Sequence, residues 1–258
     1  MRAVTRSLLC VGIVGVAGSA VAEERSSRPA GTGHFALEIG GVGHGLVRTV
    51  ESGSSLVLGA QEVPPSLAGL VDTFFHGKPR KCDLRLTSGA VVRKANDARL
   101  VSVKLPALGS GGVADLELAF TVPSITTHPL LSAKESRPPP ASARITTFRV
   151  GLSGMPAIEA PKLEAITVTQ RPDGTASASV GSEIAFEVAA GGAPPFVAWQ
   201  KAGGGKPPSR ALDIEYVGSA GTAILELRFD RCTPSSVKPL GASATTRITL
   251  ACTSVHGS

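Results

Sequence analysis

The sequence PPSLAGLVDTFFHGKP at residues 64–79 has a shorter counterpart, PPFVAWQKAGGGKP, at residues 194–207. Further along the chain, SVK at residues 102–104 is repeated at residues 236–238, so that the landmarks follow one another in the same order. Ordered landmarks indicate an internal repeat, and a repeat determines the architecture of a chain. The sequence therefore predicts two tandem, similar domains.

Each copy is expected to be mainly β, with one short helix. FALEIGG at residues 35–41 and FRVGLSG at residues 148–154 both open with a strand-like pattern. Pro64 and Pro65 suit the first turn of a helix, whose apolar residues Leu67, Val71 and Phe74 then share one face. The expected strands cover residues 35–39, 47–58, 82–87, 99–105 and 113–122, then 148–152, 163–170, 212–217, 223–228, 235–238 and 245–253, with a hairpin-like insertion at 175–188 and the second helix at 196–202. Short strands without long intervening helices exclude a parallel α/β sheet.

The chain begins with the pattern of an export signal. Arg2 and Arg6 precede a short apolar stretch, and the small residues at 20–22 resemble a cleavage site. The prediction is a cleaved signal peptide at 1–22, a flexible arm at 23–33, a first domain at 34–122, a Pro-rich linker at 123–144 and a second domain at 145–258. The expected localisation is secreted, either periplasmic or extracellular, with no membrane contact after cleavage.

Three cysteines remain after that cleavage, at positions 82, 232 and 252. Export permits disulfides, and Cys232 and Cys252 lie in or beside strand segments that are expected to be neighbours. Two alternatives stay open at this stage, a bridge between Cys232 and Cys252 or two free thiols. Cys82 is the odd cysteine in either case.

Five segments of the first copy carry a resemblance to a known family. They are FALEIGGV at 35–42, the apolar helix at 67–75 followed by HGK, CDLRL at 82–86, ARLVSVKLPAL at 98–108 and VADLELA at 113–119. Together they resemble the tail-tube proteins of contractile phages, which share a fold with the haemolysin-coregulated protein of type VI secretion. The resemblance covers most of residues 34–122 and, more weakly, residues 145–255. It implies a β-barrel or sandwich flanked by a helix, in subunits that form six-membered rings.

No arrangement typical of a catalytic, metal or cofactor site occurs in the sequence. The histidines at positions 34, 44, 76, 128 and 256 are dispersed, and we expect them to lie on the surface. Gly109–Gly112 is expected to be a hairpin loop rather than a phosphate loop, and Gly203–Lys206 ends a helix instead of beginning one. Trp199 is expected to anchor the core, with a sugar site as the alternative. The prediction is therefore a protein that is not an enzyme and needs no cofactor.

The composition of the chain limits the classes of molecule that we expect it to bind. The net charge is +6, but the basic residues are scattered and aromatic residues make up only 4% of the chain, so nucleic acid is not an expected partner. The function predicted is that of an exported structural protein that associates with itself or docks to a protein partner. A trimer would place six domains in a pseudo-hexameric ring. The alternative function is a secreted β-sandwich binding module for a carbohydrate or a protein.

Overall fold

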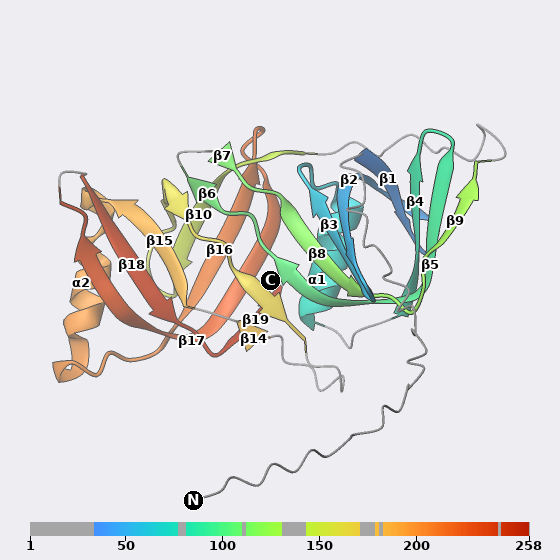
Figure 1. The fold of residues 1–258 in the computed structure, drawn as a ribbon. Coiled ribbons are helices and arrows are strands. Elements are labelled where there is room, and N and C mark those ends of the chain that lie inside the picture. The colour runs from blue at the N-terminus through green and yellow to red at the C-terminus, as the bar shows by residue number, and fades with distance from the viewer. Residues whose placement is uncertain are drawn as a thin grey trace, which may run out of the picture.

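The computed structural model describes residues 34–76, 81–109, 112–130, 143–170, 179–180, 183–241 and 244–257. The expected signal peptide and arm lie outside the described residues. The described chain is mainly β, as expected, and we divide it into a first half, residues 34–130, and a second half, residues 143–257 (Figure 1).

Six antiparallel strands of the first half close into a barrel. Around it they follow the order β5 (Val91–Lys104), β4 (Lys81–Ser88), β1 (His34–Ile39), β2 (Val42–Ser52), β3 (Ser55–Ala60) and β8 (Leu116–Thr121). The barrel closes because β5 is long enough to pair with β4 along its first part and with β8 along its last part. Because the barrel is closed, each of these six strands has a neighbouring strand on both sides and none is an edge strand.

The second half forms an open sheet. Its central order is β10 (Ile145–Leu152), β16 (Arg210–Gly218), β17 (Ala223–Pro239), β18 (Thr245–Ala251) and β15 (Ile184–Ala189). Short strands extend it at both sides, β11 (Ile158–Glu159) beside β10 and β12 (Lys162–Leu163) beside β15. β11 and β12 are not paired with each other, so the strands do not close here as they do in the first half.

Each half has one α-helix between corresponding strands. α1 (Pro65–His76) follows β3, and α2 (Pro194–Lys201) follows β15. Proline is tolerated in the first turn, where a backbone N–H would have no partner within the helix. α1 buries Leu67, Val71 and the adjacent Phe74 and Phe75, and the shorter α2 buries Phe196 and Trp199. Trp199 is therefore a core residue, as predicted.

The two halves exchange strands. β13 (Thr167–Thr169) leaves the second half and pairs with β5 of the first, followed by β14 (Ser179–Val180). In the other direction, the hairpin of β6 (Leu108–Gly109) and β7 (Gly112–Val113) joins β12 of the second half. The region expected as one strand at 163–170 is thus two strands in two different sheets, because the chain crosses between the halves at this point.

The segment expected as a linker, residues 123–144, contains a strand. β9 (Thr126–Pro129), within it, pairs with the start of β5, in the way that β19 (Ser254–Gly257) pairs with β17. Strands expected at 223–228 and 235–238 form the single long β17.

One hydrophobic core runs through both halves, and its largest fully buried side chains are Trp199, Tyr216, Phe120, Phe148, Phe186 and Phe229.

Candidate interaction surfaces

Strand register repeats between the halves. In the first half Val103 of β5 lies opposite Leu118 of β8, and in the second Val237 of β17 lies opposite Ile248 of β18. Both pairings contain a register shift. It lies between Leu100 and Ser102 in the first half and between Pro234 and Ser236 in the second. The repeated SVK triplets therefore occupy matching places in matching strands.

The same spacing extends through the adjoining strands. Leu84 pairs with Ala95 in the first half, and Leu212 pairs with Phe229 in the second. Among the described residues, Asp97 and Arg231 are the non-glycine residues with positive φ, 55° and 47°. Each lies immediately before a fully buried residue, Ala98 in β5 or Cys232 in β17. We call residues that occupy such matching register positions counterparts.

The halves meet head to tail. α1 of the first half packs against β19 and β17 of the second half. In Figure 1, α1, β14 and β19 lie in the middle of the molecule, whereas α2 lies at one end and β9 at the other. We call the contact of α1 with β17 and β19 the inner junction. The outer ends of the molecule carry the counterparts of the two surfaces that meet there.

Residues of β17 and β19 have counterparts in the first half that are more exposed. Leu225 of β17 is 5% exposed, but its counterpart in β5, Val91, is 38% exposed. Val255, in β19, is buried, whereas Ile125, its counterpart next to β9, is only half-buried. All four described residues of β9 are exposed. Among the described residues, the β9 end is thus more exposed than the corresponding surface at β17 and β19.

β2 presents the most exposed apolar side chains in the described part of the chain. Val42, Leu46 and Val50 are 51%, 49% and 64% exposed. Together with Val91 they are the exposed large hydrophobic residues there, and all four belong to the first half. A pocket of about 130 Å³ adjoins the strand, lined by His34, Leu46, Arg48, Gly59, Gln61 and Glu62.

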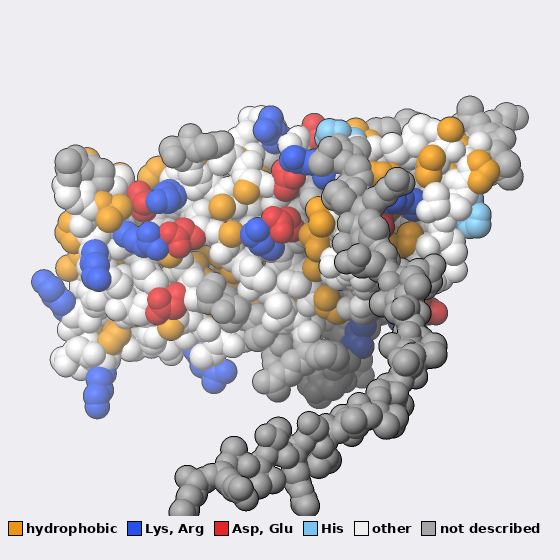
Figure 2. Space-filling view, in the orientation of Figure 1, with side chains coloured by type: hydrophobic (Ala, Val, Ile, Leu, Met, Phe, Trp, Pro, Cys, Tyr) orange, Lys and Arg blue, Asp and Glu red, His pale blue; other side chains and the backbone are white. Residues whose placement is uncertain are grey.

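Charges on the barrel's outer face are largely paired. Arg48 of β2 donates to Asp115 at 2.7 Å, and Lys104 of β5 donates to Glu117 at 2.7 Å. In the view of Figure 2, acidic and basic side chains also lie next to one another over the second half.

The open mouth of the first barrel holds an ion pair. Arg93 of β5 contacts the carboxylate of Glu51, and its guanidinium lies 5.6 Å from the ring centre of Phe35. The counterpart of Arg93 in the second half is Leu227, which is fully buried. A partly exposed guanidinium in the first half thus corresponds to a buried aliphatic side chain in the second.

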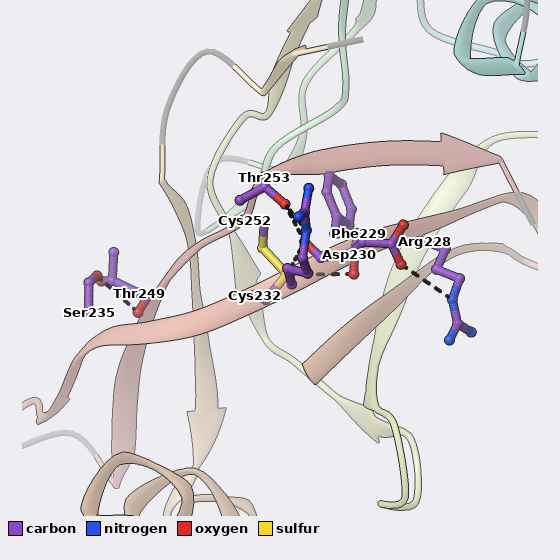
Figure 3. Close-up of a disulfide and its surroundings, with 9 residues drawn as sticks. Arg228, Phe229, Asp230, Cys232, Ser235, Thr249, Cys252 and Thr253 are labelled. Atoms are coloured by element: carbon purple, nitrogen blue, oxygen red, sulfur yellow. Dashed lines mark hydrogen bonds and ion pairs between the residues drawn. A yellow bond between two sulfur atoms is a disulfide. The ribbon is translucent and has the colours of Figure 1, made fainter. Parts of the chain in front are cut away.

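The structure joins Cys232 and Cys252 in a disulfide, with Cα atoms 4.0 Å apart (Figure 3). Cys232 lies in β17 and Cys252 follows β18, so the bond links two adjacent strands. Nearby, the Arg231 side chain donates to Thr253 Oγ1 at 3.1 Å. The counterparts in the first half are Ala98 and Val122, both buried. The disulfide therefore occupies a place that small apolar packing fills in the closed barrel.

Cys82 is a free thiol. It is half-buried in β4, and its Sγ donates to the carbonyl oxygen of Ala98 at 3.4 Å. Burial, with the nearby charge of Asp83, raises the pKa of the Cys82 thiol to about 11. A thiol with such a pKa is largely protonated at neutral pH and is a weak nucleophile.

The histidines remain separate, but one of them is not on the surface. His44 of β2 is buried, and burial lowers its pKa despite backbone hydrogen bonds with Ser66 and Ile39 that favour the charged form. The expectation of a surface position was wrong here because the register of β2 shifts beside β1, between Ala36 and Glu38. His34 lines the pocket, His76 ends α1 and His128 is exposed on β9.

No metal-ligand cluster of three or more His, Cys, Asp or Glu side chains occurs among the described residues. None of the helices in that part of the chain has the length and hydropathy of a membrane span. No protein-family model matches the chain, and no curated protein is significantly similar to it in sequence.

Proposed function

We propose that the chain is an exported structural protein, built from a duplicated β unit of tail-tube-like fold, that associates with itself. The observation that carries the proposal is the head-to-tail contact of two halves with matching strand register. Counterpart pairs occur in every strand pairing that the halves have in common, including β9 with β5 and β19 with β17. Matching over such a length is typical of duplication.

A head-to-tail contact has a consequence that a two-fold contact lacks. In a two-fold contact both partners use the same surface, and the surface is fully consumed. In a head-to-tail contact each unit uses two different surfaces, so the terminal units keep one free surface each. Such contacts generate a ring if the rotation closes and a filament if it does not. Three chains would contribute six halves to a closed pseudo-hexameric ring.

Sedimentation velocity of residues 23–258 at one to one hundred micromolar tests the proposal. We expect species larger than a single chain to increase with concentration, and negative-stain electron microscopy to show rings or short filaments. A single species with the mass of one chain at every concentration would overturn self-association.

The second candidate is a secreted binding module for a carbohydrate or a protein. The pocket beside β2 favours it, because it combines Leu46 with the polar side chains of His34 and Arg48. Glycan-array binding that is lost in a Leu46→Asp variant, together with a monomeric chain, would support this candidate over assembly.

A further inference from the structure

We propose that the second half binds the carboxylate of an acidic sugar between Arg210 and Arg231. The site is an open pocket of about 440 Å³, lined by Ser209, Arg210, Ala211, Asp230, Arg231 and Ser254. That volume lies within the roughly 300–1,000 Å³ of small-molecule sites. The inference goes beyond the proposed function and does not depend on self-association.

A β-bulge that both halves share presents Arg231. The pairing of β16 with β17 shifts register just after Arg210, and the pairing of β4 with β5 shifts just after Cys82. Arg231 and Asp97 lie opposite these two shifts, with φ of 47° and 55°. Positive φ is uncommon for a non-glycine residue, and bulges re-aim side chains toward functional sites. The backbone that presents Arg231 is therefore common to both halves.

The charges at the bulge differ between the halves. In the first half, Lys81 Nζ and the Asp97 carboxylate form an ion pair at 3.4 Å, and the counterpart of Arg210 is Cys82. In the second half, both positions carry a guanidinium. Neither Arg210 nor Arg231 forms an ion pair with any residue that the structure describes. The second half thus offers to a ligand two positive charges that the first half does not have.

Contacts within the chain orient both guanidinium groups. Arg231 Nε donates to Thr253 Oγ1 at 3.1 Å, which leaves the two terminal nitrogens as donors for a ligand. The Arg210 guanidinium lies 5.9 Å from the centre of the Trp199 ring. The disulfide joins the residue after Arg231 to the residue before Thr253 (Figure 3). A covalent bond therefore fixes the spacing between the β17 and β19 walls of the pocket.

The charge of the lining matches a monoanion. Arg210 and Arg231 contribute two positive charges and Asp230 contributes one negative charge, which leaves a net charge of +1. A single carboxylate neutralises this charge, whereas a doubly charged phosphate exceeds it. The planar fork of a guanidinium also matches the two oxygens of a carboxylate in geometry.

The other polar groups of the lining suit hydroxyl groups beside that carboxylate. Ser209 and Ser254 each provide a hydroxyl, which both donates and accepts hydrogen bonds. The Asp230 carboxylate, positioned 3.9 Å from Arg228 Nε, is an acceptor for ligand hydroxyls. A carboxylate with neighbouring hydroxyl groups is the chemistry of a uronic acid.

Nuclear magnetic resonance titration of the purified chain with glucuronate tests the site directly. We expect glucuronate to shift the side-chain Nε–H resonances of Arg210 and Arg231, and to bind at least tenfold more tightly than glucose. Added salt should weaken the binding. Equal affinity for glucose would overturn the role of the carboxylate, and equal affinity for acetate would overturn the sugar. Tighter binding of polyglutamate at the same resonances would identify an acidic peptide and overturn the inference.

Variants locate the binding. Arg231→Asp introduces the first-half residue, which adopts the same positive φ as Asp97, and is expected to weaken glucuronate binding at least tenfold. Arg210→Gln is expected to weaken it at least fivefold. The control, Lys206→Gln, removes a positive charge from an exposed residue outside the lining and should leave the affinity unchanged. Affinity that ignores both arginine variants, or that falls equally in the control, would overturn the site.

Discussion

Leu225 in β17 and Val91 in β5 occupy matching positions in matching strands, yet one is buried and the other is exposed. Arg93 and Leu227 differ in the same sense, a charged side chain at the outer mouth and an aliphatic one inside. Backbone register is therefore common to the halves, and the side chains follow what covers each surface. The strand register is thus a property of the β unit, whereas the side chains at these positions depend on the neighbouring elements.

The two sheets differ in how they are held. The first half closes by pairing β5 with β8, and it packs Ala98 and Val122 where the second half has its disulfide. The second half stays open between β11 and β12 and shares strands with the first. The open sheet lacks the restraint that closure gives the barrel. The disulfide between β17 and the end of β18 provides a covalent restraint instead.

The largest effect is expected from truncation of a buried side chain in β17. Leu225→Ala should lower the free energy of unfolding by about 2–4 kcal/mol, because it removes buried methyl groups and leaves a cavity. Val91→Ala, the matched control at the outer end, should cost less than about 1 kcal/mol. Urea unfolding of both variants measures the difference. Equal losses would mean that the two positions are equally covered in solution, against the difference in burial.

Replacing the disulfide by its first-half counterparts should have the next largest effect. Cys232→Ala/Cys252→Val should lose about 3 kcal/mol, since the bond closes a loop between residues 20 apart in sequence. The variant should also become insensitive to dithiothreitol, whereas the unchanged chain is destabilised by it. A chain whose stability is the same with and without reductant would contradict the proposed role of the bond.

A smaller effect is expected within the second half's helix. Trp199 Nε1 donates to the carbonyl oxygen of Pro208 at 2.7 Å, and the indole is fully buried. Trp199→Phe should cost about 1–3 kcal/mol because it removes the donor and leaves that carbonyl without it. Thermal unfolding followed by circular dichroism measures the loss. A variant as stable as the parent chain would show that the hydrogen bond contributes nothing net.

The smallest effect concerns pH. Burial lowers the pKa of His44 in the folded chain, so the unfolded chain binds the proton more tightly. The contribution of neutral His44 is complete above the unfolded pKa of about 6.5 and is lost progressively as the pH falls below it. His44→Gln should therefore reduce the stability lost between pH 7 and pH 5 by up to about 1 kcal/mol. His128→Gln, on the exposed β9, is the control.

The sequence by itself determined the periodic features of this protein. Alternation in FALEI predicted β1 with Phe35, Leu37 and Ile39 facing the core, and the first Pro-Pro pair predicted where α1 begins. The second helix was expected to begin at residue 196 and begins two residues earlier, at Pro194. These features are local, because side-chain alternation and the fixed φ of proline act within a few residues. The repeated SVK triplet was equally legible, and its two copies lie at matching register positions in the structure.

Only the tertiary structure decided which strands are neighbours across the halves. Residues 163–170 read as one apolar strand, but Leu163 pairs in one sheet and Val168 in the other. β9, composed of Thr126–Pro129, has no apolar alternation at all and is held by backbone pairing to β5. Alternation specifies which side of a strand is buried, but the partner strand and the exposure of Val91 depend on contacts that are distant in sequence.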